Sequence, residues 1–387
     1  MKNYCYDLFN GIFIQKTTES TVELGHCCIS KLSPPDLERI DPHTEFLEEN
    51  RKYFIETGEL PAACNYCKKA EDSGFWSRRL HHTRQNFSEN NFPTEFKLKS
   101  IDYNCDNICN LKCIMCSSYY SSSWIDDERA LGLKPKIKIK HTKHNNLIQD
   151  LDVSEVRRIY FNGGEPLMTR DHLNVLQYIV DNGSARDTQI LYSTNGTFPL
   201  TDEILEMWTK FSGLDLSCSI DGIGDVFEYV RYPGKWAEVE SNLIGFKQLR
   251  KFMEGKKLFL NFGSTVGIHN VLYVDQIYAW TQEHGFTMQV QDTNGRNQLS
   301  LENFPKRFQP QLLESIDKLP QSHIKDALLK TANSLTNEND TRWVQYLKNL
   351  DRVRGNSWKQ SLPRLYELDK KYFDSITGNY IGLRSQQ

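Results

Sequence analysis

The sequence predicts an α/β protein whose central part is an open, partial barrel of six βα units. Short runs rich in β-branched and aromatic residues recur from about residue 97 onward, and amphipathic stretches separate most of them. This alternation is typical of strands and helices on a parallel sheet. Six units are too few for a closed eight-stranded barrel and fit a partial (β/α)6 barrel.

The predicted strands are 96–104, 157–162, 188–194, 214–220, 258–266 and 287–292. The stretch after the second strand shows the helical pattern, with Asp171 as the expected cap and Asn182-Gly183 as the stop. Its apolar residues share one helical face: Leu173, Leu176, Ile179 and Val180. In a parallel sheet of this kind, functional groups gather at the carboxyl ends of the strands.

Two further regions flank the predicted barrel, which spans 97–295. Residues 1–96 are expected to form a separate, metal-bearing module with a charged helical stretch from Pro42 to Thr57. Residues 296–387 are expected to be a helical extension, without a motif beyond core patterning.

Composition excludes a partner recognised by charge alone. The 387 residues include 47 Lys and Arg and 50 Asp and Glu, for a formal charge of -3, so we expect neither nucleic acid nor a membrane surface as partner. The amino-terminal stretch does not resemble a signal peptide, and no run approaches the roughly 18 apolar residues of a membrane span. We therefore expect a cytoplasmic protein.

The ten cysteines point to metal or redox chemistry, because thiols in the cytosol are kept reduced and a chain this long needs no disulfide scaffold. Nine of them precede residue 117. Three follow the first predicted strand as Cys109-Asn-Leu-Lys-Cys113-Ile-Met-Cys116. At this spacing one loop can wrap a cubane iron-sulfur cluster and leave one iron open. A zinc knuckle completed by Cys105 or a histidine is the alternative.

Polar turns follow the next three strands. They are Gly163-Gly164-Glu165-Pro166, then Ser193-Thr194-Asn195-Gly196, then Ser219-Ile220-Asp221-Gly222 with Arg231 beyond it. The glycines allow close approach of the backbone to a bound group, and a glutamate can accept from an ammonium group. One such turn is ordinary turn chemistry, but turns at consecutive strand ends would line one rim.

The CxxxCxxC loop, GGEP and the two later turns, in this order and spacing, resemble the radical S-adenosylmethionine (SAM) superfamily over about residues 97–295. The resemblance implies that Cys109, Cys113 and Cys116 hold a [4Fe-4S] cluster whose fourth iron binds SAM. It further implies reductive cleavage of SAM to a 5′-deoxyadenosyl radical, hydrogen abstraction from a substrate C–H bond, and an electron donor such as flavodoxin or ferredoxin.

The resemblance also implies which residues contact SAM. Met115 corresponds to the position next to the adenine, and the motif Gly163, Gly164, Glu165 and Pro166 receives the amino group. Ser193, Asn195, Ser219 and Asp221 match positions used for ribose or carboxylate contacts. Arg231 resembles the arginine that pairs with the SAM carboxylate.

A second cysteine group lies in the amino-terminal region: Cys5, the pair Cys27-Cys28, and Cys64-Asn-Tyr-Cys67. By residue type alone, structural zinc held by four cysteines explains it well. The stretch GELPAACNYCKKAEDSGFWSRR resembles the auxiliary-cluster region (twitch, SPASM-like) of many radical SAM proteins, which implies a second [4Fe-4S] cluster. That module usually follows the barrel and here precedes it. The expected ligands are Cys5, Cys27, Cys64 and Cys67, with Cys28 as the alternate for Cys27.

Other reactive side chains are expected to be structural. Cys105 and Cys218 are interpreted as packed thiols. Surface or capping roles are expected for the histidines His81, His82, His141 and His144. The basic run 134–144 is interpreted as a solvated edge strand, with contact to an acidic substrate or peptide as the alternative.

The expected substrate is a peptide or protein, by analogy with other auxiliary-cluster proteins. A small amino acid, sugar or nucleotide is the second hypothesis. A zinc-stabilised, non-catalytic binding protein is the hypothesis from a different class, and it predicts zinc in place of iron and no binding of SAM.

Overall fold

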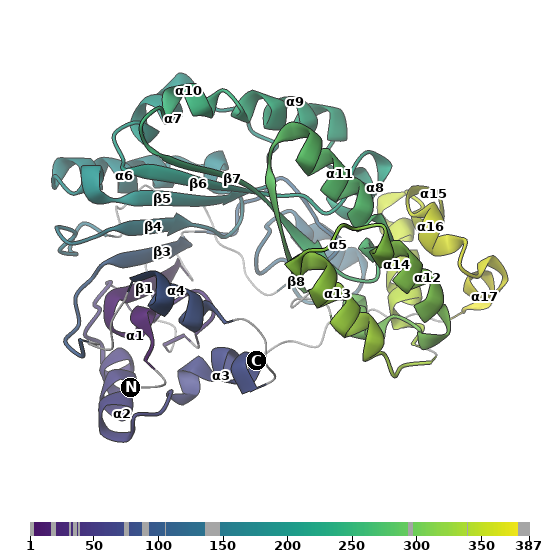
Figure 1. The fold of residues 1–387 in the computed structure, drawn as a ribbon, viewed down its shortest axis with the longest axis horizontal. Helices are drawn as coiled ribbons and strands as arrows, with labels where there is room; N and C mark the ends of the chain where they lie inside the picture. Colours follow the sequence, from purple (N-terminus) through teal and green to yellow (C-terminus); the bar gives the residue numbers. More distant parts are fainter. Residues whose placement is uncertain are drawn as a thin grey trace.

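An eight-stranded sheet forms the centre of the molecule, in the order β2-β1-β3-β4-β5-β6-β7-β8 (Figure 1). This computed structural model describes residues 4–16, 21–30, 32–33, 37, 39–72, 77–86, 93–104, 106–135, 148–292, 297–338 and 340–377. The strands are β1 Gly11–Lys16, β2 Val22–Gly25, β3 Ser100–Asn104, β4 Arg158–Phe161, β5 Gln189–Thr194, β6 Gly213–Ser219, β7 Lys257–Val266 and β8 Thr287–Asp292. All neighbours pair in parallel except β2, which is antiparallel to β1. The sheet is open, with β2 and β8 at its edges.

The strands β3 to β8 are the six predicted ones, and they stand side by side in sequence order, which confirms the predicted partial barrel. The helices between them are α5 Trp124–Ala130, α6 Asp171–Asp181, α7 Asp202–Trp208, α8 Asp225–Val230, α9 Trp236–Phe246, α10 Leu249–Phe252 and α11 Val274–His284. One detail differs from the prediction. Asp171 is the first residue of α6 and Arg170 is its cap, whereas Asn182 and the positive-φ Gly183 end the helix as expected.

The sheet has two strands beyond the six predicted, because β1 and β2 come from the amino-terminal region. β1 pairs with β3, and Gly11 lies opposite Ser100 in that pairing. The burial of β1 shows why the pattern is hard to recognise: its first five residues are all buried, so the strand lacks the alternation of a half-exposed strand. The partner strand β3 also lies more than 80 residues further along the chain, so no local pattern connects the two strands. The division into domains at residue 96 stays a prediction.

The remaining amino-terminal elements are α1 Tyr6–Asn10, α2 Glu45–Thr57, the 3-10 turn η1 Ala62–Cys64, α3 Asn65–Asp72 and α4 Arg78–Asn86. Helix α2 confirms the predicted helical stretch and ends at Gly58, which has a φ of 71°. A small second core joins α1, α2 and η1 and is formed by Tyr4, Cys5, Leu8, Phe9, Phe54, Leu60 and Cys64. Figure 1 shows these helices gathered beside β1 and β3.

The carboxyl-terminal region is helical, as expected. It contains α12 Gln309–Asp317, α13 His323–Asn333, α14 Arg342–Arg354, α15 Trp358–Ser361, α16 Pro363–Tyr366 and α17 Lys370–Ser375. Trp343, Trp358 and Phe373 contact one another edge to face and form the centre of this region. Short 3-10 turns complete the described chain: η2 Pro166–Met168, η3 Ala185–Asp187, η4 Val271–Tyr273, η5 Asn297–Leu299, η6 Leu301–Asn303 and η7 Lys306–Phe308.

The two faces of the sheet differ in character because side chains alternate along a strand. One face is apolar and joins the core shared with the helices; Ile101, Phe161 and Leu216 are examples. The alternate positions are polar and include Asp102, Arg158 and Asn261, which lie on β3, β4 and β7. The sheet therefore presents a polar inner face next to the ends of its strands.

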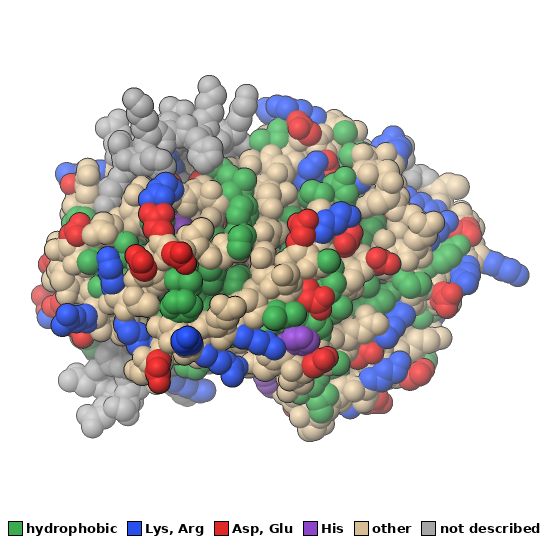
Figure 2. Space-filling model, turned by 90° about the horizontal axis from the view of Figure 1, so that it is seen from above, with side chains coloured by type: hydrophobic (Ala, Val, Ile, Leu, Met, Phe, Trp, Pro, Cys, Tyr) green, Lys and Arg blue, Asp and Glu red, His purple; other side chains and the backbone are tan. Residues whose placement is uncertain are grey.

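On the face shown in Figure 2, acidic and basic side chains are interspersed over most of the area. Within the described parts of the chain, no helix combines the length and the apolar character needed to cross a bilayer.

Candidate functional site

The loop with the cysteine triplet follows β3, and neighbouring elements hold its backbone through several carbonyl groups. Glu165 N–H donates to Ile108 O at 2.6 Å, Ser123 Oγ to Cys109 O at 2.6 Å, and Ser121 Oγ to Leu111 O at 2.6 Å. Trp124 Nε1 donates to Cys113 O at 3.0 Å. Such a network fixes the loop without help from the thiol groups.

Helix α14 supplies two further donors to this loop. The hydroxyl of Tyr346 donates to Ile114 O at 2.6 Å, and Arg354 Nη2 donates to Lys112 O at 2.7 Å. The guanidinium of Arg354 also pairs with Asp127 of α5 at 2.8 Å and lies over the ring of Trp124. The helical extension therefore holds the cysteine loop, a role that its sequence pattern did not reveal.

The side chains of the loop separate by polarity. Leu111 and Ile114 are both buried, and Ile114 belongs to the main core. Of the thiols, Cys109 is buried, and Cys113 and Cys116 are partly exposed. Burial raises the pKa of Cys109, and the neighbouring Cys113 and Cys116 thiols contribute in the same direction. A cysteine thiol binds a metal only when it is deprotonated, and the bound cation would then compensate the negative charge of the thiolate.

The glycines of GGEP bring their loop against the cysteine loop. A Cβ on Gly164 would lie 2.2 Å from Ile108 O, and one on Gly163, whose φ is 85°, would lie 1.8 Å from Asn104 Oδ1. From the sequence, these glycines were expected to allow close approach of a bound group. In the structure Gly164 is required for the approach of this loop to the cysteine loop, and Gly163 for its approach to Asn104 at the end of β3.

Glu165 joins the loops after β4 and β5 through its buried carboxyl group. Thr194 Oγ1 donates to Oε1 at 2.8 Å, Leu167 N–H donates to the same oxygen at 3.1 Å, and Asn195 N–H donates to Oε2 at 2.6 Å. Burial raises the pKa of Glu165 to about 7, against the effect of these hydrogen bonds. Both carboxyl oxygens thus already accept from the protein.

Asn195 lies directly above the first thiol. Its Nδ2 is 3.7 Å from Cys109 Sγ and 2.9 Å from Asn110 Oδ1, while its Oδ1 accepts from Thr197 N–H at 2.9 Å. Ser193, two residues earlier on β5, hydrogen-bonds instead to the hydroxyl of Tyr160 at 2.6 Å. The structure therefore brings Asn195 to the cysteine loop and places Ser193 on the inner face of the sheet.

Arg231 and Asp221 form a buried ion pair of 2.7 Å beside the second thiol. Arg231 Nη1 lies 3.7 Å from Cys113 Sγ, and Nε is buried without a hydrogen-bond partner. Asp221 Oδ1 accepts from Thr265 N–H at 2.7 Å, and Asn270 Nδ2 donates to Asp221 O at 3.0 Å. Burial raises the pKa of Asp221, and the guanidinium opposes that shift. The unpartnered donor fits an anionic group at this position.

The other residues that the sequence analysis placed around SAM lie on the same rim with fewer contacts. Met115 packs partly against the core, Pro166 is buried at the start of η2, and Ser219 ends β6 half-buried. The structure brings the triplet, Glu165, Asn195, Asp221 and Arg231 together at the carboxyl ends of β3 to β6.

Four of the amino-terminal thiols line one cavity. The cavity has a volume of about 10 Å³, and its walls are Cys5, Asp7, His26, Cys27, Ile29, Ser30, Cys64, Cys67 and Arg79. Cys5 precedes α1, Cys27 follows β2, Cys64 ends η1, and Cys67 lies one turn further on in α3. These are the four ligands expected from the sequence.

Cys28 points elsewhere. Its Sγ accepts from Arg78 Nη1 at 3.1 Å, and its N–H donates to Asp102 Oδ2 at 3.1 Å. Arg78 pairs with Asp7 at 2.9 Å and with Asp102 at 2.7 Å, so this cation links the amino-terminal elements to β3. The ion-pair network, like the contacts of α14, escaped sequence analysis because isolated charged residues carry no positional signal.

Both thiol groups fit iron-sulfur clusters by their donor chemistry. Burial raises the pKa of Cys27 and of Cys5, so each thiol needs a cation to become a thiolate. Among the described residues, no three His, Cys, Asp or Glu side chains converge closely enough to hold a single ion. The cysteines that hold a four-iron cluster each bind a different iron and need not converge on one point.

Several sequence expectations concern other residues. Cys218 is fully buried in the main core, which confirms its interpretation as a packed thiol. His82 is also buried and its Nδ1 lies 3.0 Å from Asp7 Oδ1, so the expected surface role was wrong. Cys105, His141 and His144 lie outside the described residues, as does most of the basic run.

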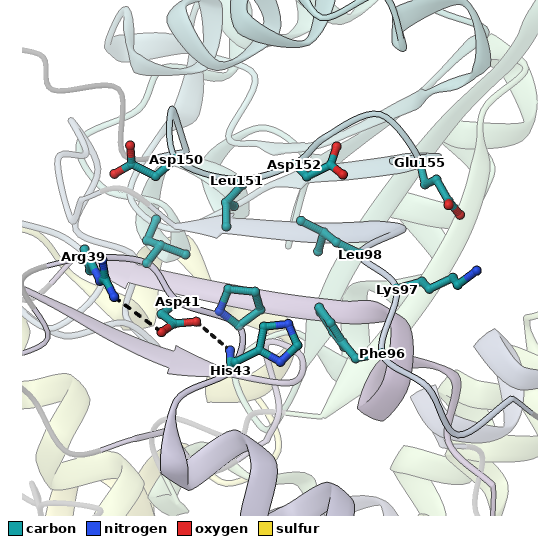
Figure 3. Close-up of a pocket in the computed structure, with 12 residues that line it drawn as sticks. Arg39, Asp41, His43, Phe96, Lys97, Leu98, Asp150, Leu151, Asp152 and Glu155 are labelled. Atoms are coloured by element: carbon teal, nitrogen blue, oxygen red, sulfur yellow. Dashed lines mark hydrogen bonds and ion pairs between the residues drawn. The ribbon is translucent and has the colours of Figure 1, made fainter.

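A separate cavity of about 480 Å³ lies where β3 and β4 begin, at the opposite end of these strands from the cysteine triplet (Figure 3). Asp150, Asp152 and Glu155 lie along one wall, and Phe96 and His43 along another. No cysteine is among the residues that line it. It belongs to neither thiol group.

Comparison with known proteins gives similarity to solved structures only. No family model matches the chain, and no curated protein is significantly similar to it. The structure is similar to "Native anSMEcpe with bound AdoMet", at 16% identity over 67% of this chain and 68% of that chain, with a TM-score of 0.42. It is also similar to Streptococcus suis SuiB bound to precursor peptide SuiA, at 12% identity over 90% of this chain and 78% of that chain, with a TM-score of 0.40. The structure of SuiB bound to S-adenosylmethionine is similar over 82% of this chain and 68% of that chain, at 12% identity and a TM-score of 0.36. At these TM-scores the similarity assigns neither a substrate nor the role of any residue.

Proposed function

We propose that this chain is a radical SAM enzyme that carries a second, auxiliary iron-sulfur cluster. One observation carries the proposal: the CxxxCxxC loop is held by the residues of the GGEP and Asn195 turns and of Arg231, so the motifs that resemble the family meet at one site. A [4Fe-4S] cluster at Cys109, Cys113 and Cys116 would supply an electron for the reductive cleavage of SAM.

The protein's own residues would hold and shield the reactants. The unpartnered Nε of Arg231 is a donor for the carboxylate of SAM, and Asp221 keeps the guanidinium in place. Glu165 holds the loops together through both carboxyl oxygens. The GGEP motif would receive the amino group of SAM through the remaining acceptor capacity of this carboxylate and through the backbone carbonyls of Gly163 and Gly164. The 5′-deoxyadenosyl radical would then abstract hydrogen from the substrate.

The substrate that we propose is a peptide or protein, on the resemblance of the amino-terminal cysteine region to auxiliary-cluster proteins. A small amino acid, sugar or nucleotide is the alternative substrate. The electron donor would be a flavodoxin- or ferredoxin-type protein. Mass spectrometry of candidate peptides after anaerobic incubation with SAM and reductant would distinguish the two substrate classes.

The first experiment is metal analysis of protein purified without oxygen. About eight iron and eight sulfide per chain are expected for two cubane clusters. Zinc in place of iron, even after anaerobic reconstitution, would instead favour the zinc-stabilised binding protein. Cys113→Ala should abolish formation of 5′-deoxyadenosine, and retained product would contradict the assignment of the triplet.

The neighbouring cysteines 27 and 28 provide a matched pair for the auxiliary site. Cys27→Ser should lower total iron by about four per chain, because Cys27 lines the thiol cavity. Cys28→Ser should leave iron unchanged, since Cys28 Sγ faces Arg78 instead. Equal loss in both variants, or loss only in Cys28→Ser, would overturn the proposed ligand set.

A further inference from the structure

The thiol cavity contains a fully buried imidazole that has no hydrogen-bond partner. His26 is 1% exposed, and neither Nδ1 nor Nε2 has a partner. The residue precedes Cys27 and lines the same cavity as the four thiols. A buried donor left unpaired costs about 1–3 kcal/mol, so a histidine in this position is expected to have a partner in the cavity.

The polar groups around His26 are already engaged. Asp7 accepts from Arg78 through Oδ2 and contacts His82 through Oδ1. Arg79 donates to Tyr4 O and to Glu71. Ser30 Oγ accepts from the N–H of His26 itself and donates to Cys27 O. Among the polar side chains that line the cavity, thiols aside, only the ring of His26 is therefore uncommitted.

We propose that His26 donates an N–H to a sulfur atom of the cluster that Cys5, Cys27, Cys64 and Cys67 hold. The inference rests on the auxiliary cluster of the proposed function and goes beyond it by naming a residue that sets the properties of that cluster. Hydrogen bonding suits the ring better than ligation, because four thiols already supply one ligand for each iron of a cubane. Either neutral tautomer and the protonated ring carry an N–H, so the bond does not depend on titration of the histidine.

The consequence is a higher reduction potential of the auxiliary cluster. A donor to sulfur stabilises the extra negative charge of the reduced cluster, and the surrounding hydrogen bonds are among the factors that set such potentials. Loss of this one donor should therefore make the auxiliary cluster harder to reduce. Each guanidinium nitrogen of Arg79 already donates to Tyr4 or Glu71, whereas neither ring nitrogen of His26 has a partner.

The experiment uses the full chain with Cys113→Ala, so that the auxiliary cluster is observed alone. His26→Leu removes the donor, His26→Gln replaces it with an amide N–H, and His269→Leu is the matched control. His269 is likewise fully buried with both ring nitrogens unpartnered, but it lies outside the thiol cavity. Redox titration followed by electron paramagnetic resonance gives the potential, and pulsed spectroscopy in H₂O and D₂O detects an exchangeable proton near the reduced cluster.

We expect a more negative potential and loss of the exchangeable-proton signal in His26→Leu, partial recovery in His26→Gln, and no change in His269→Leu. An unchanged potential and proton signal in His26→Leu would overturn the inference, as would the nitrogen coupling of a directly bound imidazole. If the substituted chains lose the cluster, the same proton and nitrogen couplings measured with unsubstituted His26 decide the question. Absence of iron from the Cys113→Ala protein itself would refute the auxiliary cluster, which separates the two failures.

Discussion

Tyr346→Phe tests whether helix α14 holds the cysteine loop. The substitution removes one hydroxyl group and leaves the ring, which is 1% exposed, in place. The hydroxyl donates to Ile114 O at 2.6 Å, one residue after Cys113. Loss of a buried hydrogen bond of this kind costs about 1–3 kcal/mol. At about 1.4 kcal/mol for each factor of ten, local opening of the loop should become about 5 to 150 times more frequent.

The assay follows iron release to a chelator without oxygen. In a Cys64→Ala background only the cluster at the triplet should remain, so the rate reports on this loop. Tyr178→Phe is the control, because its hydroxyl donates to Gln149 O at 2.7 Å, before β4 begins and away from the triplet. Faster release in Tyr346→Phe alone is expected. Equal rates in the two variants would refute the role of α14 in holding the loop.

Three other substitutions test the structure. Gly164→Ala should lower the iron bound at the triplet by about four per chain, because the new Cβ would lie 2.2 Å from Ile108 O. Gly245→Ala is the control, since nothing lies within 4 Å of a Cβ at that position. Full iron content of the Gly164→Ala protein would contradict the contact. Arg78→Ala should lower the free energy of unfolding by about 3 kcal/mol, because it removes a cation that pairs with the buried carboxylates of Asp7 and Asp102. Denaturant titration measures this change, and a loss below about 1 kcal/mol would show that the two ion pairs contribute little to stability. Burial lowers the pKa of His172 to about 4, below its usual value of 6.5, so the folded state binds fewer protons and loses stability as pH falls from about 6.5 towards 4. The loss is about 1.4 kcal/mol at about pH 5.5, and His172→Gln should reduce it; identical pH dependence of unfolding in the two proteins would argue against a buried neutral ring.

Local patterns in the sequence determined much of the fold and of the site. The strands β3 to β8 lie within a few residues of their predicted positions, because hydrophobic runs bounded by turns and periodic helices are local signals. The triplet and the turns at Glu165 and Asn195 were recognisable for the same reason, since each motif is contiguous and follows a strand. The parallel topology then required these loops to meet at one edge of the sheet.

Other features depended on which way a side chain points and on contacts between distant parts of the chain. Cys27 and Cys28 are adjacent and chemically identical in the sequence, and only the turn after β2 directs one into the thiol cavity and the other towards Arg78. Tyr346 reaches Ile114 across 232 positions, and β1 joins β3 across most of the amino-terminal region. A linear pattern records neither direction nor distance in space. The residue types and their spacing thus determined which chemistry the chain can hold, and the tertiary packing decided which side chains surround it.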